Sequence, residues 1–345
     1  MIDMQLLNTL YVTTPESYIH LDNETLRVEV EKETRLRVPL HHLSAVICFG
    51  HVSVSLPLMH KLAEIGISLV LLDAHGRFKA RLEGPVSGNV LLRQAQHRLA
   101  GDPAFSLNVA RNCVAGKLRN CRQVLLRGAR EAKTPDDAAI LTRGAADLAA
   151  ALRGLPGAGD ADALRGIEGE AARQYFAALN ALIRQPSRET FRMDGRSRRP
   201  PRDRINALLS FVYSLLMNDC RSAVEACGLD PQIGFLHVVR PGRAALALDL
   251  MEEFRAFADR LVLSLINRGQ IGADDFVERE GGAVLLEGDA RKTVLVAYQE
   301  RKQENLAHPL LSESVPLGLL PHIQARLLAR TLRGDTAEYL PYLVR

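Results

Sequence analysis

The sequence predicts an α+β protein in which a small N-terminal β-rich domain precedes a larger, all-helical catalytic domain. Short runs of branched and alternating apolar residues, separated by turn residues, fill about the first eighty positions. Apolar residues at helical spacing dominate from residue 91 onward. With 345 residues, the chain exceeds the usual size of one domain, so two domains are expected.

The N-terminal elements follow from these patterns. Turn residues at Pro15-Glu16 and Asp22-Asn23 separate the first strands. Residues 55–65 have apolar side chains at helical spacing, and Gly66 ends this helix as a C-cap. Strands are expected at residues 6–12, 17–21, 25–30, 34–39, 43–49 and 67–72, and a hairpin turn at 74–77.

Glu83-Gly84-Pro85 marks a linker between the two halves. We therefore expect domains at residues 1–82 and 91–345, joined by residues 83–90. A small hairpin is expected within the second domain, at residues 283–286 with 293–297. Helices are expected at residues 91–99, 104–125, 136–154, 161–183, 204–226, 244–265 and 309–332.

Composition excludes several classes of protein. Tryptophan is absent and aromatic residues make up 5%, so base stacking is not expected to be the main contact with nucleic acid. Five cysteines without a CxxC pair argue for a reducing cytoplasm. No signal peptide and no membrane-length apolar run is visible, so a soluble cytoplasmic protein is expected. GxSxG, Walker A, Rossmann and zinc patterns are also missing.

Glu168 stands on the first turn of an expected helix, between Gly166 and Gly169. Glycines on both sides let the backbone approach a ligand closely. A carboxylate at a helix start is also favoured by the helix macrodipole without any ligand. The motif leaves both interpretations open.

Asp249, Glu252 and Glu253 lie in an apolar stretch that is expected to be helical. Spacings of three and four place these side chains on one helical surface. An acidic cluster in so apolar a context is costly unless a cation compensates its charge. The alternative is a solvated acidic stripe in which Glu252 or Glu253 pairs with Arg255 or Arg240.

His237 ends an apolar stretch, just before a basic turn. A histidine in such a place is more often structural than a ligand, but a short turn would bring it over the start of the acidic helix. Carboxylates with one imidazole form an oxygen-rich metal site of the kind that phosphoryl-transfer enzymes use.

Residues 191–204 hold six arginines and two aspartates. Guanidinium groups bind phosphate in bidentate fashion, which suits a DNA backbone. A solvated flexible loop is the alternative. The arginines expected to bind DNA are Arg192, Arg196, Arg198, Arg199 and Arg202.

Three motifs in order resemble one family. They are Gly166-Ile167-Glu168-Gly169 with Tyr175-Phe176, residues 199–216, and residues 234–255 from Gly-Phe-Leu-His to the acidic helix. The pattern of residues 43–72 also looks like the β domain of this family. Together they strongly resemble the CRISPR-associated endonuclease/integrase that captures new spacers, "protein one" of its system, with details like the type I-C branch.

The resemblance implies a metal-dependent DNA endonuclease and integrase. Such an enzyme inserts new spacers into a CRISPR array when a 3′-hydroxyl group attacks a phosphodiester. Carried onto this chain, the catalytic residues and metal ligands are Glu168, His237 and Glu252, with Mg²⁺ or Mn²⁺ as cofactor. Asp249 matches a second acidic position, which is usually near the metal and less often a ligand.

Asn206, Ser210 and Tyr213 share one face of the helix at 204–226 and are expected to support the substrate or the ligands. A hydrogen-bond network at the edge of the core is the alternative.

The resemblance also implies partners. These are double-stranded DNA (the prespacer and the CRISPR leader-repeat), a second copy of the chain bound through the N-terminal domain, and the small companion "protein two", in a heterohexamer. No membrane partner is expected. A non-catalytic DNA-binding scaffold of the adaptation complex is the first alternative function, and a metal-dependent phosphohydrolase of nucleotides is the second.

Overall fold

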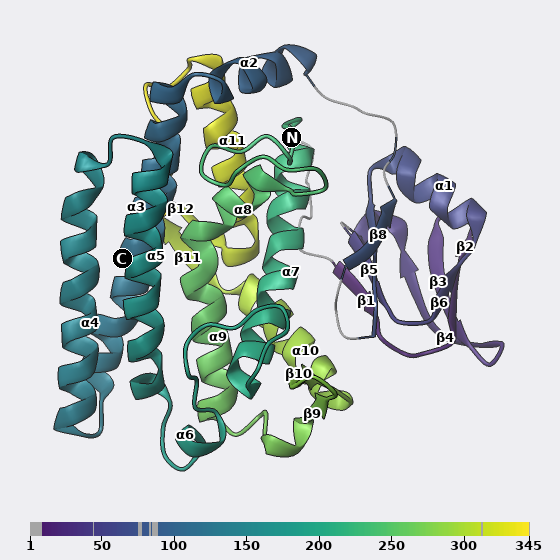
Figure 1. The fold of residues 1–345 in the computed structure, drawn as a ribbon. Coiled ribbons are helices and arrows are strands. Elements are labelled where there is room, and N and C mark those ends of the chain that lie inside the picture. Colours follow the sequence, from purple (N-terminus) through teal and green to yellow (C-terminus); the bar gives the residue numbers. More distant parts are fainter. Residues whose placement is uncertain are drawn as a thin grey trace. The chain divides into compact units, whose positions relative to one another are not determined.

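The computed structural model describes residues 9–43, 45–74, 78–82, 84, 89–311 and 313–344. The chain forms two compact units (Figure 1). The first contains residues 1–87 with two short later pieces, residues 299–304 and 317–319. The second contains the rest of the chain. The expected architecture, a β-rich N-terminal region followed by a mostly helical part, is confirmed.

The N-terminal unit is built from two sheets. One has the order β4-β3-β2-β6, and the other has the order β1-β5-β7-β8. Strand β5 runs parallel to both β1 and β7. The strands are β1 (Thr9–Val12), β2 (Ser17–Asp22), β3 (Thr25–Val30), β4 (Glu33–Pro39), β5 (Ala45–Phe49), β6 (Val52–Val54), β7 (Ser68–Leu72) and β8 (Phe78–Leu82).

Helix α1 (Leu56–Ile65) completes the core of this unit. Its N-cap Ser55 accepts a hydrogen bond from Leu58 N, and its C-cap Gly66 has a φ of +75°, which glycine tolerates. Leu58 and Leu62 are buried in one cluster with residues of both sheets, among them Ile19 and Leu69. The expected helix and its glycine stop are confirmed.

Strands β6 and β8 were not expected from the sequence. β6 is a Val-Ser-Val segment too short for a clear pattern, and β8 carries charged residues on an exposed edge. The hairpin turn expected at 74–77 lies mostly outside the described residues, as do residues 6–8 of the first strand and all but residues 84, 89 and 90 of the linker at 83–90.

The second unit is a helical body whose helices begin at polar caps. Asp102, Thr134, Asp160 and Asp203 each accept a backbone N–H bond at the start of a helix. The helices are α2 (Val90–Ala100), α3 (Pro103–Glu131), α4 (Pro135–Gly154), α5 (Ala161–Leu179), α6 (Ser187–Thr190), α7 (Arg204–Ala226), α8 (Ala245–Met251), α9 (Arg255–Asn267), α10 (Asp289–Gln303) and α11 (Leu320–Arg333).

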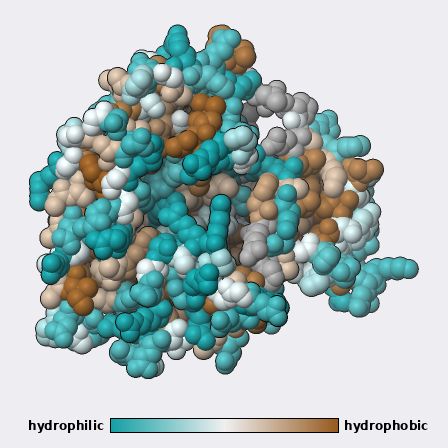
Figure 2. All heavy atoms as spheres, viewed as in Figure 1, coloured by the Kyte–Doolittle hydropathy of each residue, from teal (hydrophilic) through white to brown (hydrophobic). Residues whose placement is uncertain are grey.

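Helix α3 runs through the centre of this body. It packs against α4, α5, α9 and the 3₁₀ turn η4 (Glu252–Phe254) (Figure 1). Its buried face includes Cys113, Val114, Leu118 and Cys121 at helical spacing, with Lys117 in the same stripe. Hydrophilic side chains cover much of the face seen in Figure 2, which agrees with an apolar interior.

The C-terminal third departs from expectation in three places. The helix expected at 244–265 is divided into α8, η4 and α9. Residues 293–297 lie inside α10, because β10 (Ala283–Leu286) pairs instead with β9 (Phe276–Arg279). The helix expected from residue 309 begins at Leu320, since β11 (Asn305–His308) and β12 (Glu313–Pro316) form a hairpin before it.

Among the described residues, no helix is both long enough and apolar enough to span a membrane.

Candidate metal and DNA site

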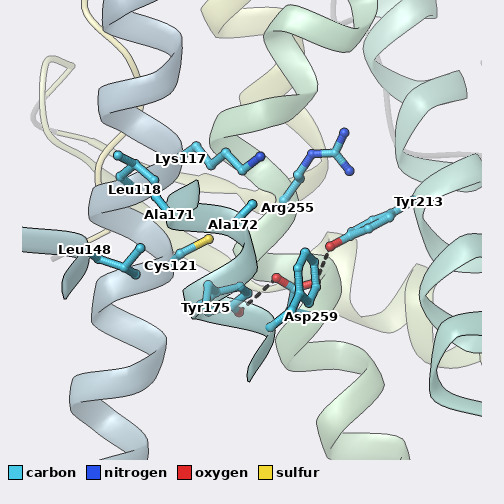
Figure 3. Close-up of a pocket in the computed structure, with 11 residues that line it drawn as sticks. Lys117, Leu118, Cys121, Leu148, Ala171, Ala172, Tyr175, Tyr213, Arg255 and Asp259 are labelled. Atoms are coloured by element: carbon cyan, nitrogen blue, oxygen red, sulfur yellow. Dashed lines mark hydrogen bonds between the residues drawn. The ribbon is translucent and has the colours of Figure 1, made fainter. Parts of the chain in front are cut away.

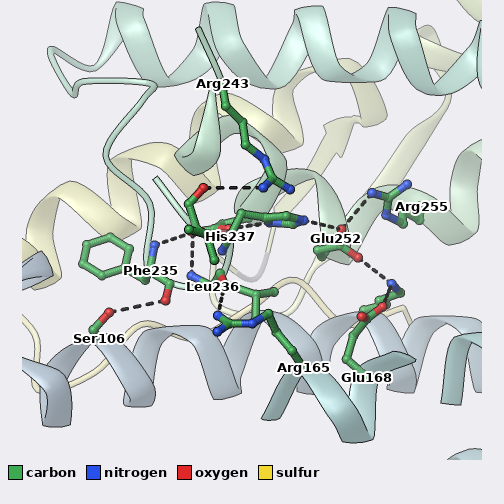
Figure 4. A network of polar contacts seen from close by, with 12 residues as sticks. Ser106, Arg165, Glu168, Phe235, Leu236, His237, Arg243, Glu252 and Arg255 are labelled. Carbon is green, nitrogen blue, oxygen red and sulfur yellow. Dashed lines mark hydrogen bonds and ion pairs between the residues drawn. The ribbon is translucent and has the colours of Figure 1, made fainter. Parts of the chain in front are cut away.

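Glu168, Glu252 and His237 come together from three segments that are distant in sequence (Figure 4). Glu168 lies in the interior of α5 and not on its first turn as expected, because the helix already begins at Ala161. Glu252 lies on η4, and His237 on the loop before α8. His237 Nε2 lies 3.8 Å from Glu252 Oε1. The side chains of Glu168 and His237 are 24% and 20% exposed, so the cluster is open to solvent on that side.

Asp249 fixes the orientation of His237. Its Oδ1 lies 2.7 Å from His237 Nδ1 and accepts the His237 backbone N–H at 2.9 Å. Its Oδ2 accepts the backbone N–H groups of Phe235 at 2.5 Å and Leu236 at 3.0 Å. With both oxygens engaged and only 1% of the residue exposed, Asp249 positions the imidazole and leaves Nε2 facing Glu252.

Gly234 is required by this close packing. A Cβ atom there would lie 2.6 Å from Asp249 Oδ2 and 2.8 Å from the backbone carbon of Ala245. Real side chains do not approach so closely, so any larger residue would push the histidine-bearing loop away from α8.

Three more side chains tie this loop to the helical body. The buried Gln96 donates from Nε2 to the carbonyls of Asp230 and Ile233, both at 2.8 Å. Arg165 donates to the Leu236 carbonyl at 3.0 Å, and Ser106 to the Phe235 carbonyl at 3.3 Å (Figure 4). The loop is therefore held from α2, α3 and α5.

Glu252 is 3% exposed and ionised. Burial opposes its charge, but Arg255 and Lys117 together hold the pKa of this carboxyl well below its ordinary value. Arg255 donates to Glu252 Oε1 at 2.8 Å. Its guanidinium lies 4.8 Å from the centre of the Tyr213 ring, a cation–π contact.

The basic partner at the centre of the cluster is Lys117, which sequence reasoning did not select. Its Nζ donates to Glu168 Oε1 and lies 2.7 Å from Glu252 Oε2. Burial would lower its pKa, but the charges of Glu252 and Glu168 raise it above the ordinary value. The available signal was a lysine within the apolar stripe of the helix expected at 104–125.

These residues fit a divalent ion by their chemistry. Two carboxylates and an imidazole suit Mg²⁺ or Mn²⁺. Glu252 Oε2 is buried, and its neighbour among the described residues is the ammonium group of Lys117, at ion-pair distance. Within the described part of the chain, no three His, Cys, Asp or Glu side chains form a ready-made metal cluster. In this site, Lys117 lies between Glu168 and Glu252.

The neighbouring Glu253 points the other way and is fully buried. It accepts hydrogen bonds from the Tyr339 hydroxyl, the Tyr342 backbone N–H and Gln324. Burial raises its pKa to about 8 although these donors oppose the shift. Glu253 thus anchors the C-terminal segment and is not a site residue. The solvated acidic stripe is wrong because both glutamates are buried, but the pairing of Glu252 with Arg255 that this alternative included is present.

Asn206, Ser210 and Tyr213 all contact Arg196, and Asn206 and Tyr213 are buried. Asn206 Oδ1 accepts from Arg196 at 2.6 Å, and Ser210 Oγ accepts from the same guanidinium at 3.2 Å. Tyr213 donates to Asp259 at 2.5 Å, and Tyr175 donates to the other oxygen of Asp259 at 2.9 Å, at a small pocket (Figure 3). Of these three residues, Tyr213 is the one linked to a proposed ligand, because Arg255 contacts both the Tyr213 ring and Glu252.

The arginine-rich loop divides into two groups. Arg196 is folded inward, 5.4 Å from the Tyr213 ring centre and bonded to Asn206. This guanidinium holds the loop against α7, so Arg196 is not one of the exposed arginines of the loop. The exposed arginines of the loop are Arg192, Arg198, Arg199 and Arg202.

Comparison with known proteins identifies the family of this chain. The family model described as "CRISPR associated protein Cas1" matches residues 10–300. A "CRISPR-associated endonuclease Cas1 1" from Moorella thermoacetica is 58% identical over 341 residues, covering 99% of both chains. The chain belongs to the Cas1 family. It is a CRISPR-associated endonuclease of that family, as the three motifs predicted.

Solved structures related to Cas1 share its fold. A chain titled "Cas6-RT-Cas1--Cas2 complex" matches with a TM-score of 0.83 at 25% identity, over 97% of this chain and 36% of that chain. A "Casposase bound to integration product" matches with a TM-score of 0.82 at 21% identity, over 97% of this chain and 92% of that chain. The Cas1 fold is therefore present across nearly the whole chain.

Proposed function

We propose that this Cas1-family endonuclease joins new spacers to a CRISPR array by DNA strand transfer. The observation that carries the proposal is the convergence of Glu168, Glu252 and the oriented His237 Nε2 at one solvent-accessible place. Two acidic residues and an imidazole match the chemistry of phosphodiester attack.

The proposed ligands are Glu168, His237 and Glu252, and the proposed ion is Mg²⁺ or Mn²⁺. When bound, the ion supplies positive charge to the attacked phosphodiester and to the leaving 3′-oxygen. The histidine makes Mn²⁺ an acceptable alternative to Mg²⁺.

The surrounding side chains prepare the site. Asp249 holds His237 with Nε2 toward Glu252, and Arg255 and Lys117 lower the pKa of Glu252. The attacking group is the 3′-hydroxyl of the incoming DNA in integration, and water in hydrolysis. The same site serves both, because each reaction is an in-line displacement at phosphorus.

Arg192, Arg198, Arg199 and Arg202 are proposed to bind the DNA backbone, since they are the exposed cations of their loop. Arg196 is proposed to shape the loop from inside. Contacts of this kind are independent of sequence, so any preference for a DNA motif must come from elsewhere.

Partners and organisation follow from the family. We propose domains at residues 1–82 and 91–345 with a linker at 83–90, and a homodimer formed through the first domain. A small companion protein completes the assembly, with two homodimers on a central companion dimer; Cas2 accompanies Cas1 in the related complex described above. Type I-C membership is also proposed, on the details of the three motifs.

One experiment distinguishes strand transfer from the two alternative functions, a DNA-binding scaffold and a nucleotide phosphohydrolase. We would incubate a short duplex bearing 3′-hydroxyl ends with supercoiled plasmid, with and without the companion protein, in Mn²⁺, Mg²⁺ or EDTA. Metal-dependent nicked or joined product is expected. DNA binding without product would instead indicate a scaffold, and hydrolysis of nucleotides but not DNA would indicate a phosphohydrolase.

A further inference from the structure

One ammonium group lies between two of the three proposed metal ligands. Lys117 extends from α3 and is 7% exposed. Its Nζ donates to Glu168 Oε1 and lies 2.7 Å from Glu252 Oε2, so it contacts one oxygen of each carboxylate. Glu252 Oε1 already accepts a hydrogen bond from Arg255, so an ion bound by both carboxylates would compete with Lys117 for Glu252 Oε2.

We propose that Lys117 is the resident cation of the metal site: it holds Glu168 and Glu252 together before the divalent ion arrives, and the ion must displace it to bind. Lys117 thereby sets the affinity of the site for the ion. The inference rests on the proposed function, because it requires Glu168 and Glu252 to be ligands.

The charges around Glu252 indicate which cation moves. Arg255 donates to Glu252 Oε1 and packs on the Tyr213 ring, so two independent contacts hold it. The ammonium group of Lys117 is held by the two carboxylates themselves. A lysine is a point charge on a flexible stem, whereas an arginine stacked on a ring is held in place.

The balance of charge also favours displacement. Glu168, Glu252 and the nearby Asp249 contribute three negative charges, and Lys117 and Arg255 contribute two positive charges. A divalent ion added beside both cations would make the net charge of the site positive and would be repelled by the ammonium group. Withdrawal of the ammonium group frees Glu168 Oε1 and Glu252 Oε2 and relieves that repulsion.

The test compares Mn²⁺ affinity among full-length variants by titration calorimetry. Lys117→Met removes the charge and keeps an unbranched, flexible side chain that is only slightly shorter. It should bind Mn²⁺ at least about tenfold more tightly than wild type, because a competing charge a few ångströms away is gone. Lys117→Arg keeps the charge and should bind no more tightly than wild type. Lys133→Met removes an exposed lysine after α3 and should leave the affinity unchanged.

Equal or weaker binding by Lys117→Met would overturn the inference, since Lys117 would then not compete with the ion. Thermal unfolding gives a second measure that does not depend on activity. In EDTA, Lys117→Met should melt below wild type, because two carboxylates lose their shared cation, and Mn²⁺ should raise its Tm more than it raises that of wild type. An unchanged Tm in EDTA would also contradict the inference.

A separate pair of variants tests whether Glu168 and Glu252 bind the ion at all. Glu168→Ala and Glu252→Ala should bind Mn²⁺ much more weakly than wild type if both are ligands. Wild-type affinity in both would overturn the proposed ligands and, with them, the role of Lys117. Lys117→Gln, with a polar side chain, repeats the comparison if Lys117→Met does not fold.

Discussion

His237 Nδ1 and Asp249 Oδ1 lie 2.7 Å apart, and this contact determines which ring nitrogen of His237 points into the site. The same carboxylate accepts three consecutive backbone N–H groups, from Phe235, Leu236 and His237. One buried aspartate therefore shapes the loop and selects the nitrogen that faces Glu252. The proposed role of Asp249 is therefore to position His237 rather than to bind the ion.

Asp249→Asn is expected to lower strand transfer about 10- to 100-fold. An amide nitrogen would replace one oxygen and face N–H donors, so the histidine would lose its orientation. Single-turnover strand transfer across a Mn²⁺ titration measures the effect. Asp230→Asn on the same loop, whose carboxylate is partly exposed, is the control and should retain activity. Full activity of Asp249→Asn at low Mn²⁺ would remove the proposed role.

Gly234→Ala and Gly166→Ala should behave in opposite ways. At Gly234 the new Cβ would meet Asp249 Oδ2 at 2.6 Å, so both Tm and strand transfer should fall. At Gly166, on α5, a Cβ meets nothing within 4 Å, and alanine should stabilise the helix by about 0.5–1 kcal/mol. Thermal unfolding distinguishes them. A tolerated Gly234→Ala would show that the loop has room to move.

The arginines of the loop should separate into binding and structural groups. Replacing Arg198, Arg199 and Arg202 with alanine should weaken DNA binding across sequences. It should also reduce the slope of log affinity against log salt, by roughly 0.9 for each phosphate that is no longer neutralised. Arg196→Ala should instead lower the Tm, because the buried Asn206 and the partly buried Ser210 lose a hydrogen-bond donor. Fluorescence anisotropy at several salt concentrations measures the slope. An unchanged slope in the triple variant would exclude this loop as the phosphate-binding element.

Asn120 ties α3 to η4 and to the C-terminal segment. Its Nδ2 donates to the carbonyls of Glu253 at 2.8 Å and Tyr342 at 2.9 Å, and its Oδ1 accepts from Val344 N at 2.9 Å. Asn120→Ala should lower the free energy of unfolding by about 1–3 kcal/mol, since it leaves buried groups unpaired. Urea unfolding measures this. Asn108→Ala, at an exposed position of α3, should change little, and equal effects would contradict the assignment.

Much of the fold was predictable because its signals are local. Gly66 marked the end of α1, and helical periodicity found α1, α3, α5 and α7. The hairpin β11–β12 was missed because its strands have four residues each, which is too short for a pattern. Helix α8 ends at the 3₁₀ turn η4, which turns Glu252 and Glu253 in different directions, and periodicity alone did not predict that break.

The site was predictable in part. Residue types and the family resemblance selected Glu168, His237 and Glu252, and the structure brings them together. Lys117 lies on a helix far from the three motifs, and its role depends on tertiary packing that spacing does not reveal. Arg196 belonged to a basic run, yet it is folded inward, because a charge run does not distinguish an exposed guanidinium from one paired with Asn206.

The most direct test compares two glutamates on the same helix. Glu168 contacts the central Lys117, whereas Glu170, two residues later, is exposed and paired with Arg173. Strand transfer into supercoiled plasmid in Mn²⁺ should be abolished in Glu168→Gln and retained in Glu170→Gln, with both variants folded and binding DNA as wild type does. Near-normal strand transfer by Glu168→Gln would contradict the proposed metal site.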